Sequence, residues 1–180
     1  DTDFREKIVL NRMSFDEPIS KLATYGIKTV DADDFLLPNY LQVIEKYLSL
    51  DSGFFYPNYN LVDFKGEHIQ EFNLPNFDEV EILSRGDFLA TGTLYEAKLI
   101  KKLGGYNTNI VNSGVENYEF ILDLLSAGVK GCQIPEVLFC YRRHEKNISK
   151  LKKTEIITNG RNMFIRKNLG KFVTNEFHPY

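Results

Sequence analysis

The chain has 180 residues, 43 % of them hydrophobic, which suffices for one sizeable core, so we expect one domain over residues 1–170 followed by a tail over residues 171–180. Its 22 basic and 25 acidic residues leave no electrostatic basis for binding nucleic acid. No apolar run approaches the ~18 residues of a transmembrane helix, so we expect a cytoplasmic protein, either free or peripheral to the membrane.

The two cysteines, Cys132 and Cys140, match neither a zinc-binding nor a redox spacing. We expect them to be buried thiols of a reducing compartment, and a disulfide between them is the alternative. The sequence begins Asp-Thr-Asp-Phe, with neither a methionine nor a signal peptide, which is typical of an excised or processed fragment.

The first quarter of the chain is predicted to alternate strand and helix. Residues 7–10 form a short strand, residues 15–25 a helix that ends at Gly26, and residues 27–30 a β-branched strand. Pro38 then opens a run of apolar residues at helical spacing, at the first-turn position that proline tolerates. This alternation is typical of an α/β fold.

Three carboxylates, Asp31, Asp33 and Asp34, directly follow the predicted strand 27–30. Open α/β sheets bind their ligands at this position, beyond the carboxyl ends of strands. Carboxylates this close repel one another unless a cation lies between them, and Mg²⁺ and Mn²⁺ prefer such oxygen ligands. The alternative is a solvated acidic turn, in which Asp34 simply lies near a helix N-terminus.

The rest of the chain is predicted to continue this mixture of strands and helices. Pro57 indicates an edge strand or a bulge, and Gly104 is expected to end a short helix. The predicted elements, in order, are strands 53–63 and 68–72 joined as a hairpin, a short helix within 74–85, a strand 88–96, a helix 97–103, a helix within 112–128, strands 129–134 and 137–141, and a helix 154–167.

Polar residues of interest lie at the start of the helix within 112–128 and just after the last predicted strand. Glu116 and Asn117 fall in the first turn of the helix within 112–128, so their side chains can point towards whatever its N-terminus faces. Arg142, Arg143 and His144 open a basic loop after the last predicted strand. If the two arginines continue the strand they point to opposite faces, so at most one of them is expected to reach an anionic ligand bound there.

Residues 30–41, Val-Asp-Ala-Asp-Asp-Phe-Leu-Leu-Pro-Asn-Tyr-Leu, resemble the metal-binding segment of the inverting family-two glycosyltransferases, which have the GT-A fold. Residues 114–120, 127–130 and 134–149 are similar, in order and spacing, to the acceptor-side half of that family. The resemblance implies a GT-A-like mixed sheet flanked by helices. Because the family carries further βα units upstream, it also implies an N-terminally truncated domain whose exposed sheet edge favours self-association.

The resemblance also implies roles for particular residues. In this family the Asp-x-Asp segment binds the diphosphate of a nucleotide sugar through Mn²⁺ or Mg²⁺. Asp33 is therefore the expected metal ligand, with Asp31 contacting the donor or the metal. His144 is expected to be a further metal ligand or a phosphate contact, with a structural role as the alternative. Arg143 is the expected arginine of the donor site.

The expected catalytic base departs from the family pattern. The family uses the aspartate of a Glu-Asp pair, whereas this chain has Glu116 and Asn117, and a neutral amide accepts no proton. Either Glu116 takes over as the base, or the protein binds a donor without efficient transfer. The alternative role for Glu116 is complementarity to the helix dipole, worth under ~1 kcal/mol.

The expected function is transfer of a sugar, with inversion, from a nucleotide-diphosphate donor to a carbohydrate or lipid-linked saccharide acceptor, as in polysaccharide biosynthesis. One alternative is a catalytically degenerate binding module or an inactive fragment of such an enzyme. A nucleotidyltransferase, which has the same need for an acidic metal site, is a further alternative.

Overall fold

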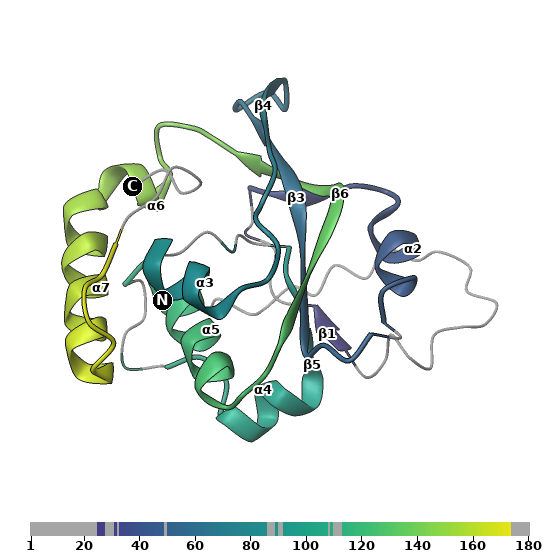
Figure 1. Ribbon diagram of the computed structural model, residues 1–180. Coiled ribbons are helices and arrows are strands. Elements are labelled where there is room, and N and C mark those ends of the chain that lie inside the picture. The colour runs from purple at the N-terminus through teal and green to yellow at the C-terminus, as the bar shows by residue number, and fades with distance from the viewer. Residues whose placement is uncertain are drawn as a thin grey trace.

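A six-stranded mixed sheet forms the centre of the computed structural model (Figure 1). The structure describes residues 25–27, 31, 33–48, 50–85, 89, 92–107, 109 and 113–173. The predicted strand 7–10, residues 15–24 of the first predicted helix and residues 28–30 of the next predicted strand lie outside these ranges. Within them the prediction of an α/β fold with helices flanking a mixed sheet is confirmed.

The strands run in the order β1-β5-β3-β6-β2, and β4 pairs with β3 beside this path. The two long central strands, β3 and β6, are parallel, and the other pairings are antiparallel. The strands are β1 (Tyr25–Ile27), β2 (Phe35–Leu36), β3 (Phe54–Val62), β4 (His68–Phe72), β5 (Leu94–Glu96) and β6 (Gly131–Arg142).

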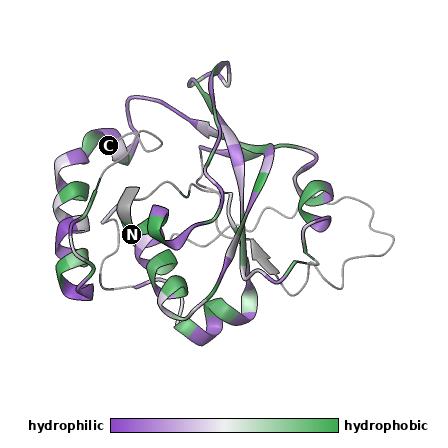
Figure 2. Cartoon of the chain, viewed as in Figure 1, coloured by the Kyte–Doolittle hydropathy of each residue, from purple (hydrophilic) through white to green (hydrophobic). Residues whose placement is uncertain are grey.

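Helices cover both faces of the central strands. Figure 1 shows α2 on one side of β3 and β6, and α3, α5 and α7 on the other. These helices show bands of hydrophobic and hydrophilic residues, as expected when one side of a helix is buried (Figure 2). The described helices are α2 (Tyr40–Glu45), α3 (Glu79–Arg85), α4 (Ala97–Leu103), α5 (Glu116–Ser126), α6 (Ile148–Leu151) and α7 (Lys153–Lys167).

The sheet separates two hydrophobic clusters. Phe54 belongs to the cluster formed with α3, α5 and α7, whereas the next residue, Phe55, belongs to the cluster formed with α2. Consecutive residues of a strand point to opposite faces, so this division follows directly from the alternation of β3. Because both faces are covered, eight of the nine residues of β3 are buried.

The predicted hairpin and the bulge at Pro57 are confirmed. Strands β3 and β4 pair antiparallel, and the register between β3 and β6 shifts on both sides of Asn58. The alternative of an edge strand is wrong, because β3 pairs with β6 on one side and with β5 and β4 on the other. Asn58 fills the irregularity: its Oδ1 accepts hydrogen bonds from the Leu74 amide and from Gln133.

Several predicted boundaries are wrong. Strand β6 is continuous through Pro135, where two strands were expected, because β3 carries a matching irregularity. The strand expected over residues 88–96 is shorter, since Gly92 and Thr93 lie outside it. Tyr25, expected at the end of a helix, is the first residue of β1, which pairs with β5. Strand β2 was not predicted at all.

The first residues of the predicted tail 171–180 pack against the fold, although a tail is expected to be loosely held. Phe172 is only 6 % exposed and its ring packs against Tyr118 and Phe164. Gly160 makes room for this ring, because a Cβ there would lie 2.4 Å from it. Residues 174–180 lie outside the described ranges.

Two further expectations can be compared with the described residues. Cys132 and Cys140 are free thiols, so the disulfide alternative is wrong, and burial raises the pKa of both. In the part of the chain that the structure describes, no helix is both long and apolar enough to cross a bilayer.

Candidate functional site

The acidic turn lies against the end of β6. The Asp34 amide donates to the Asp31 carbonyl at 3.0 Å, which closes a turn, and the next two residues form β2. Strand β2 pairs antiparallel with β6 through Phe35 and Cys140. A carboxylate oxygen of Asp34 accepts the Arg142 backbone amide at 2.8 Å, so the turn is tied to β6 by side-chain as well as backbone contacts.

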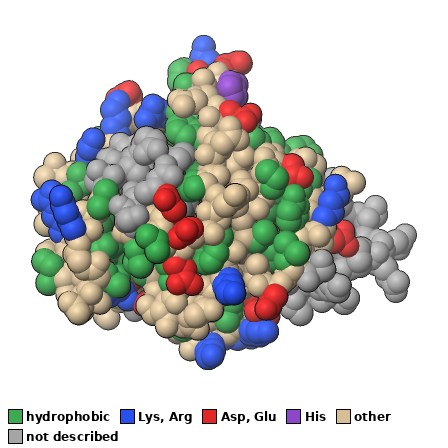
Figure 3. All heavy atoms as spheres, in the orientation of Figure 1, with side chains coloured by type: hydrophobic (Ala, Val, Ile, Leu, Met, Phe, Trp, Pro, Cys, Tyr) green, Lys and Arg blue, Asp and Glu red, His purple; other side chains and the backbone are tan. Residues whose placement is uncertain are grey.

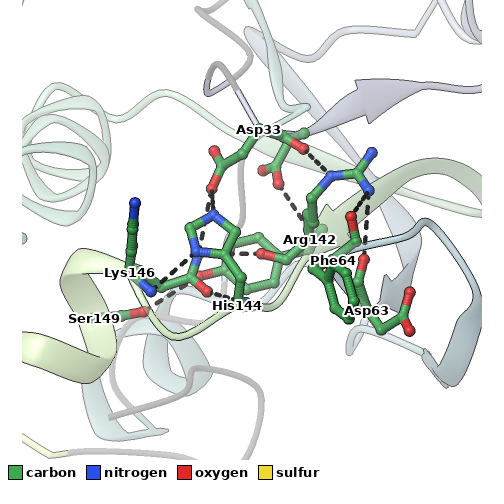
Figure 4. A network of polar contacts seen from close by, with 10 residues as sticks. Asp33, Asp63, Phe64, Arg142, His144, Lys146 and Ser149 are labelled. Atoms are coloured by element: carbon green, nitrogen blue, oxygen red, sulfur yellow. Dashed lines mark hydrogen bonds and ion pairs between the residues drawn. The ribbon is translucent and has the colours of Figure 1, made fainter.

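Asp33 and His144 are in direct contact (Figure 4). The Asp33 Oδ2 atom lies 2.8 Å from His144 Nε2 and also accepts a hydrogen bond from Asn147 Nδ2 at 3.3 Å. The other ring nitrogen of His144, Nδ1, accepts the Lys146 amide at 3.1 Å. Because an accepting Nδ1 carries no proton, the proton of the neutral ring sits on Nε2 and is donated to Asp33.

The Asp33–His144 pair has a spacing that a divalent cation accepts. Two ligands at neighbouring octahedral positions, each ~2.1 Å from the ion, lie about 3.0 Å apart, close to the observed 2.8 Å. Ligation by Nε2 would require the ring proton to move to Nδ1, which would break the hydrogen bond from the Lys146 amide. Among the described residues no group of three His, Cys, Asp or Glu comes together as a complete metal cage. An ion held by Asp33 and His144 would take its remaining ligands from phosphate oxygens and water, and it would need the His144 proton to move from Nε2 to Nδ1.

Arg142, rather than Arg143, contacts the acidic turn. Its Nε donates to the Asp33 carbonyl at 2.8 Å and its Nη1 to the Phe64 carbonyl at 3.0 Å, so the guanidinium bridges the turn and the β3–β4 hairpin (Figure 4). Its carbon Cζ also lies 5.4 Å from the centre of the Phe35 ring. Arg143 donates its backbone amide to Val62, and its side chain is exposed.

Glu116 lies in the first turn of α5, as predicted. Its Oε1 accepts the Ser113 backbone amide at 2.7 Å, and Ser113 Oγ in turn accepts the Val115 amide at 3.3 Å. These contacts fix the carboxylate at the helix N-terminus, where the dipole also favours negative charge. Asn117 is half-buried in the same turn.

Two tyrosines lie within electrostatic range of the acidic turn. Burial, together with the carboxylates of Asp31 and Glu116, raises the pKa of Tyr106. Burial also raises the pKa of Tyr141, to which the Asp34, Asp31 and Asp33 carboxylates add, while its hydrogen bond with Ser149 has the opposite effect. Asp31 thus lies within electrostatic range of both phenols. Asp31 and Glu116 both lie within electrostatic range of Tyr106.

The sequence prediction missed Tyr106, Tyr141 and Asn147 as parts of this site. Tyr106 follows the predicted helix end at Gly104, but an aromatic residue in that position indicates no chemistry by itself. No sequence pattern indicated Asn147, because its contact with Asp33 depends on how the loop after β6 folds back.

Comparison of the chain with protein-family models and with curated proteins finds no match. A proposal of function therefore rests on the sequence motifs and on the contacts described above.

Proposed function

We propose that this protein is a metal-dependent, inverting glycosyltransferase with a GT-A-like fold, which moves a sugar from a nucleotide-diphosphate donor to a saccharide-type acceptor. The 2.8 Å contact between Asp33 Oδ2 and His144 Nε2 carries the proposal. These residues belong to two separate sequence motifs, 111 positions apart, and both were expected at the donor site. Their contact supports a common role.

The donor side would be built from the acidic turn and the loop after β6. Asp33 and His144 would hold Mn²⁺ or Mg²⁺, and the bound cation supplies positive charge that offsets the phosphoryl groups of the donor. Asp31, in the same turn, would contact the donor. Arg143 leaves the end of β6 with an exposed guanidinium, which suits it to pair with a phosphoryl oxygen.

The acceptor side would be built on the first turn of α5. Glu116 uses Oε1 for the Ser113 amide, which leaves its second oxygen outside that contact and suited to accept the proton of an acceptor hydroxyl. Asn117 would contribute hydrogen bonds only. Tyr106 lies within electrostatic range of both Asp31 and Glu116, which is consistent with placing the two sides on one face of the sheet edge.

Donor turnover tests this assignment. Nucleotide-sugar consumption in the presence of Mn²⁺ is compared between wild type, Glu116→Gln and Glu79→Gln, the last being a matched control because Glu79 also lies in the first turn of a helix. Loss of a general base costs on the order of 10²–10⁴ in rate, so Glu116→Gln should fall by that factor and Glu79→Gln should not change. Equal rates for Glu116→Gln and wild type would exclude Glu116 as the general base.

The second candidate, a degenerate module that binds the donor without turnover, is favoured by Asn117, which stands where the family has its base. Asn117→Asp separates the two candidates. Turnover in wild type supports the active enzyme, whereas turnover that appears only in Asn117→Asp supports the degenerate one. Release of pyrophosphate instead of nucleoside diphosphate would indicate a nucleotidyltransferase.

A further inference from the structure

Positive charge is concentrated at the C-terminal end of the described chain. Residues 141–173 hold ten of the 22 basic residues but only two of the 25 acidic ones, so this segment is strongly basic in a protein that is acidic as a whole. Figure 3 shows Lys and Arg side chains along the side of the molecule formed by α6 and α7. Glu119 and Asp123 of α5 offset Arg166 and Lys167, and the positive charge that remains favours an anionic partner for this side.

Helix α6 adds exposed apolar side chains to this charge. Ile148 is 51 % exposed and Leu151 is 68 % exposed, and they lie three positions apart, on the same side of a helical turn. Four lysines flank them. We call this set the α6 patch: Lys146, Ile148, Lys150, Leu151, Lys152 and Lys153.

Two of the four lysines form no ion pair with a described residue, and the pairs of the other two are weak. Lys150 pairs with Glu145 and Lys152 with Glu155, but both pairs are solvent-exposed and therefore worth little. Lys146 and Lys153 are exposed, and neither forms an ion pair within the described residues. The patch thus combines uncompensated positive charge with exposed aliphatic groups.

We propose that the α6 patch docks this protein on an anionic lipid surface, with Ile148 and Leu151 entering the interface and the lysines facing the headgroups. Apolar residues rimmed by lysine are the composition of interfacial membrane contacts. Each lysine near an anionic leaflet contributes about 1 kcal/mol, or about fivefold in partitioning. A nucleic acid would use the lysines but would leave the two aliphatic side chains exposed, and the patch offers no aromatic ring for base stacking.

Docking would bring the candidate site to the membrane. Helix α6 begins directly after Asn147, which donates to Asp33, and four residues after His144. An acceptor carried by a lipid would therefore be presented beside the donor side of the site. The docking itself does not depend on the proposed function, because it requires only the α6 patch.

A fluorescence experiment tests insertion. The chain contains no tryptophan, so Leu151→Trp introduces a single reporter, and Val80→Trp is the control, since Val80 is 69 % exposed on α3 between Glu79 and Glu81. Vesicles of phosphatidylcholine alone are compared with vesicles that also contain phosphatidylserine. The emission of Leu151→Trp should shift to the blue with the anionic vesicles only, and that of Val80→Trp should not shift. An unshifted Leu151→Trp, or an equal shift in both variants, overturns the proposal.

Cosedimentation of the full chain with the same vesicles tests the charge. Lys146→Gln, Lys152→Gln and Lys153→Gln together should weaken partitioning onto the anionic vesicles by about 100-fold. The control carries the same charge change at exposed lysines elsewhere, namely Lys65→Gln, Lys101→Gln and Lys102→Gln, and should lose much less. Equal losses in the two triple variants, or preferential binding of wild type to single-stranded DNA over the anionic vesicles, would contradict the proposal.

Discussion

Gly114 offers a stringent test of how α7 packs against the start of α5. Its φ is +75°, where an alanine costs about 1–2 kcal/mol. A Cβ there would also lie 2.5 Å from Cγ1 of Ile156, a side chain that is 1 % exposed and cannot move aside freely. Overpacking of this kind costs about 1–3 kcal/mol. We therefore expect Gly114→Ala to lower the free energy of unfolding by about 2–5 kcal/mol.

Urea denaturation followed by circular dichroism measures this loss, and Gly128→Ala is the control. Gly128 has a φ of +72° but nothing within 4 Å of its Cβ position, so only the backbone cost of about 1–2 kcal/mol should remain. In addition, Gly114→Ala and Ile156→Ala should be non-additive, since removing the isoleucine relieves the clash. If Gly114→Ala costs no more than Gly128→Ala, the described packing of Ile156 on this loop is wrong.

Three further predictions concern the stability of the fold. Burial raises the pKa of Tyr40, so the folded state keeps its phenol proton while the unfolded state releases it above pH ~10. Above that pH, this residue should lower the free energy of unfolding of wild type by about 1.4 kcal/mol per pH unit. Tyr40→Phe should lack this contribution. Equal alkaline slopes in urea denaturation would contradict this. The side chain of Glu119 is 7 % exposed and pairs with Arg166 and Lys167, whose side chains are partly exposed. Glu119→Gln should therefore lower the free energy of unfolding by about 1–3 kcal/mol, and by less at high salt. A loss that salt leaves unchanged would exclude the ion pairs as its cause. Phe172→Ala should cost about 3–5 kcal/mol in thermal unfolding, whereas a loose tail would show no change.

Sequence periodicity predicted the elements whose pattern is local. Tyr118, Ile121 and Leu122 share one side of α5 and are all buried, as their spacing indicates. The same helix carries Glu116 in its first turn, so this part of the candidate site followed from helical spacing and an N-terminal boundary alone.

What the sequence could not predict depends on contacts between distant segments. Strand β2 has two residues, and it exists because Phe35 and Leu36 pair with the end of β6. The choice between Arg142 and Arg143 depends on which face of β6 meets the acidic turn, and no local pattern determines that face. Phe172 is buried because Gly160, twelve residues earlier, lacks a side chain. The burial of this aromatic residue could therefore not be predicted from the polar segment around it.

The proposed cation and donor site at Asp33 and His144 is tested most directly by calorimetric titration of a nucleoside diphosphate in the presence and absence of Mn²⁺. Wild type should bind only with Mn²⁺. Because loss of even a residue that supports a metal ligand weakens binding by about 10–100-fold, Asp33→Asn should weaken it at least that much. Asp51→Asn, an exposed aspartate after α2, should have no effect. Nucleoside-diphosphate binding that does not depend on Mn²⁺, or that is as tight in Asp33→Asn as in wild type, would contradict the proposed site.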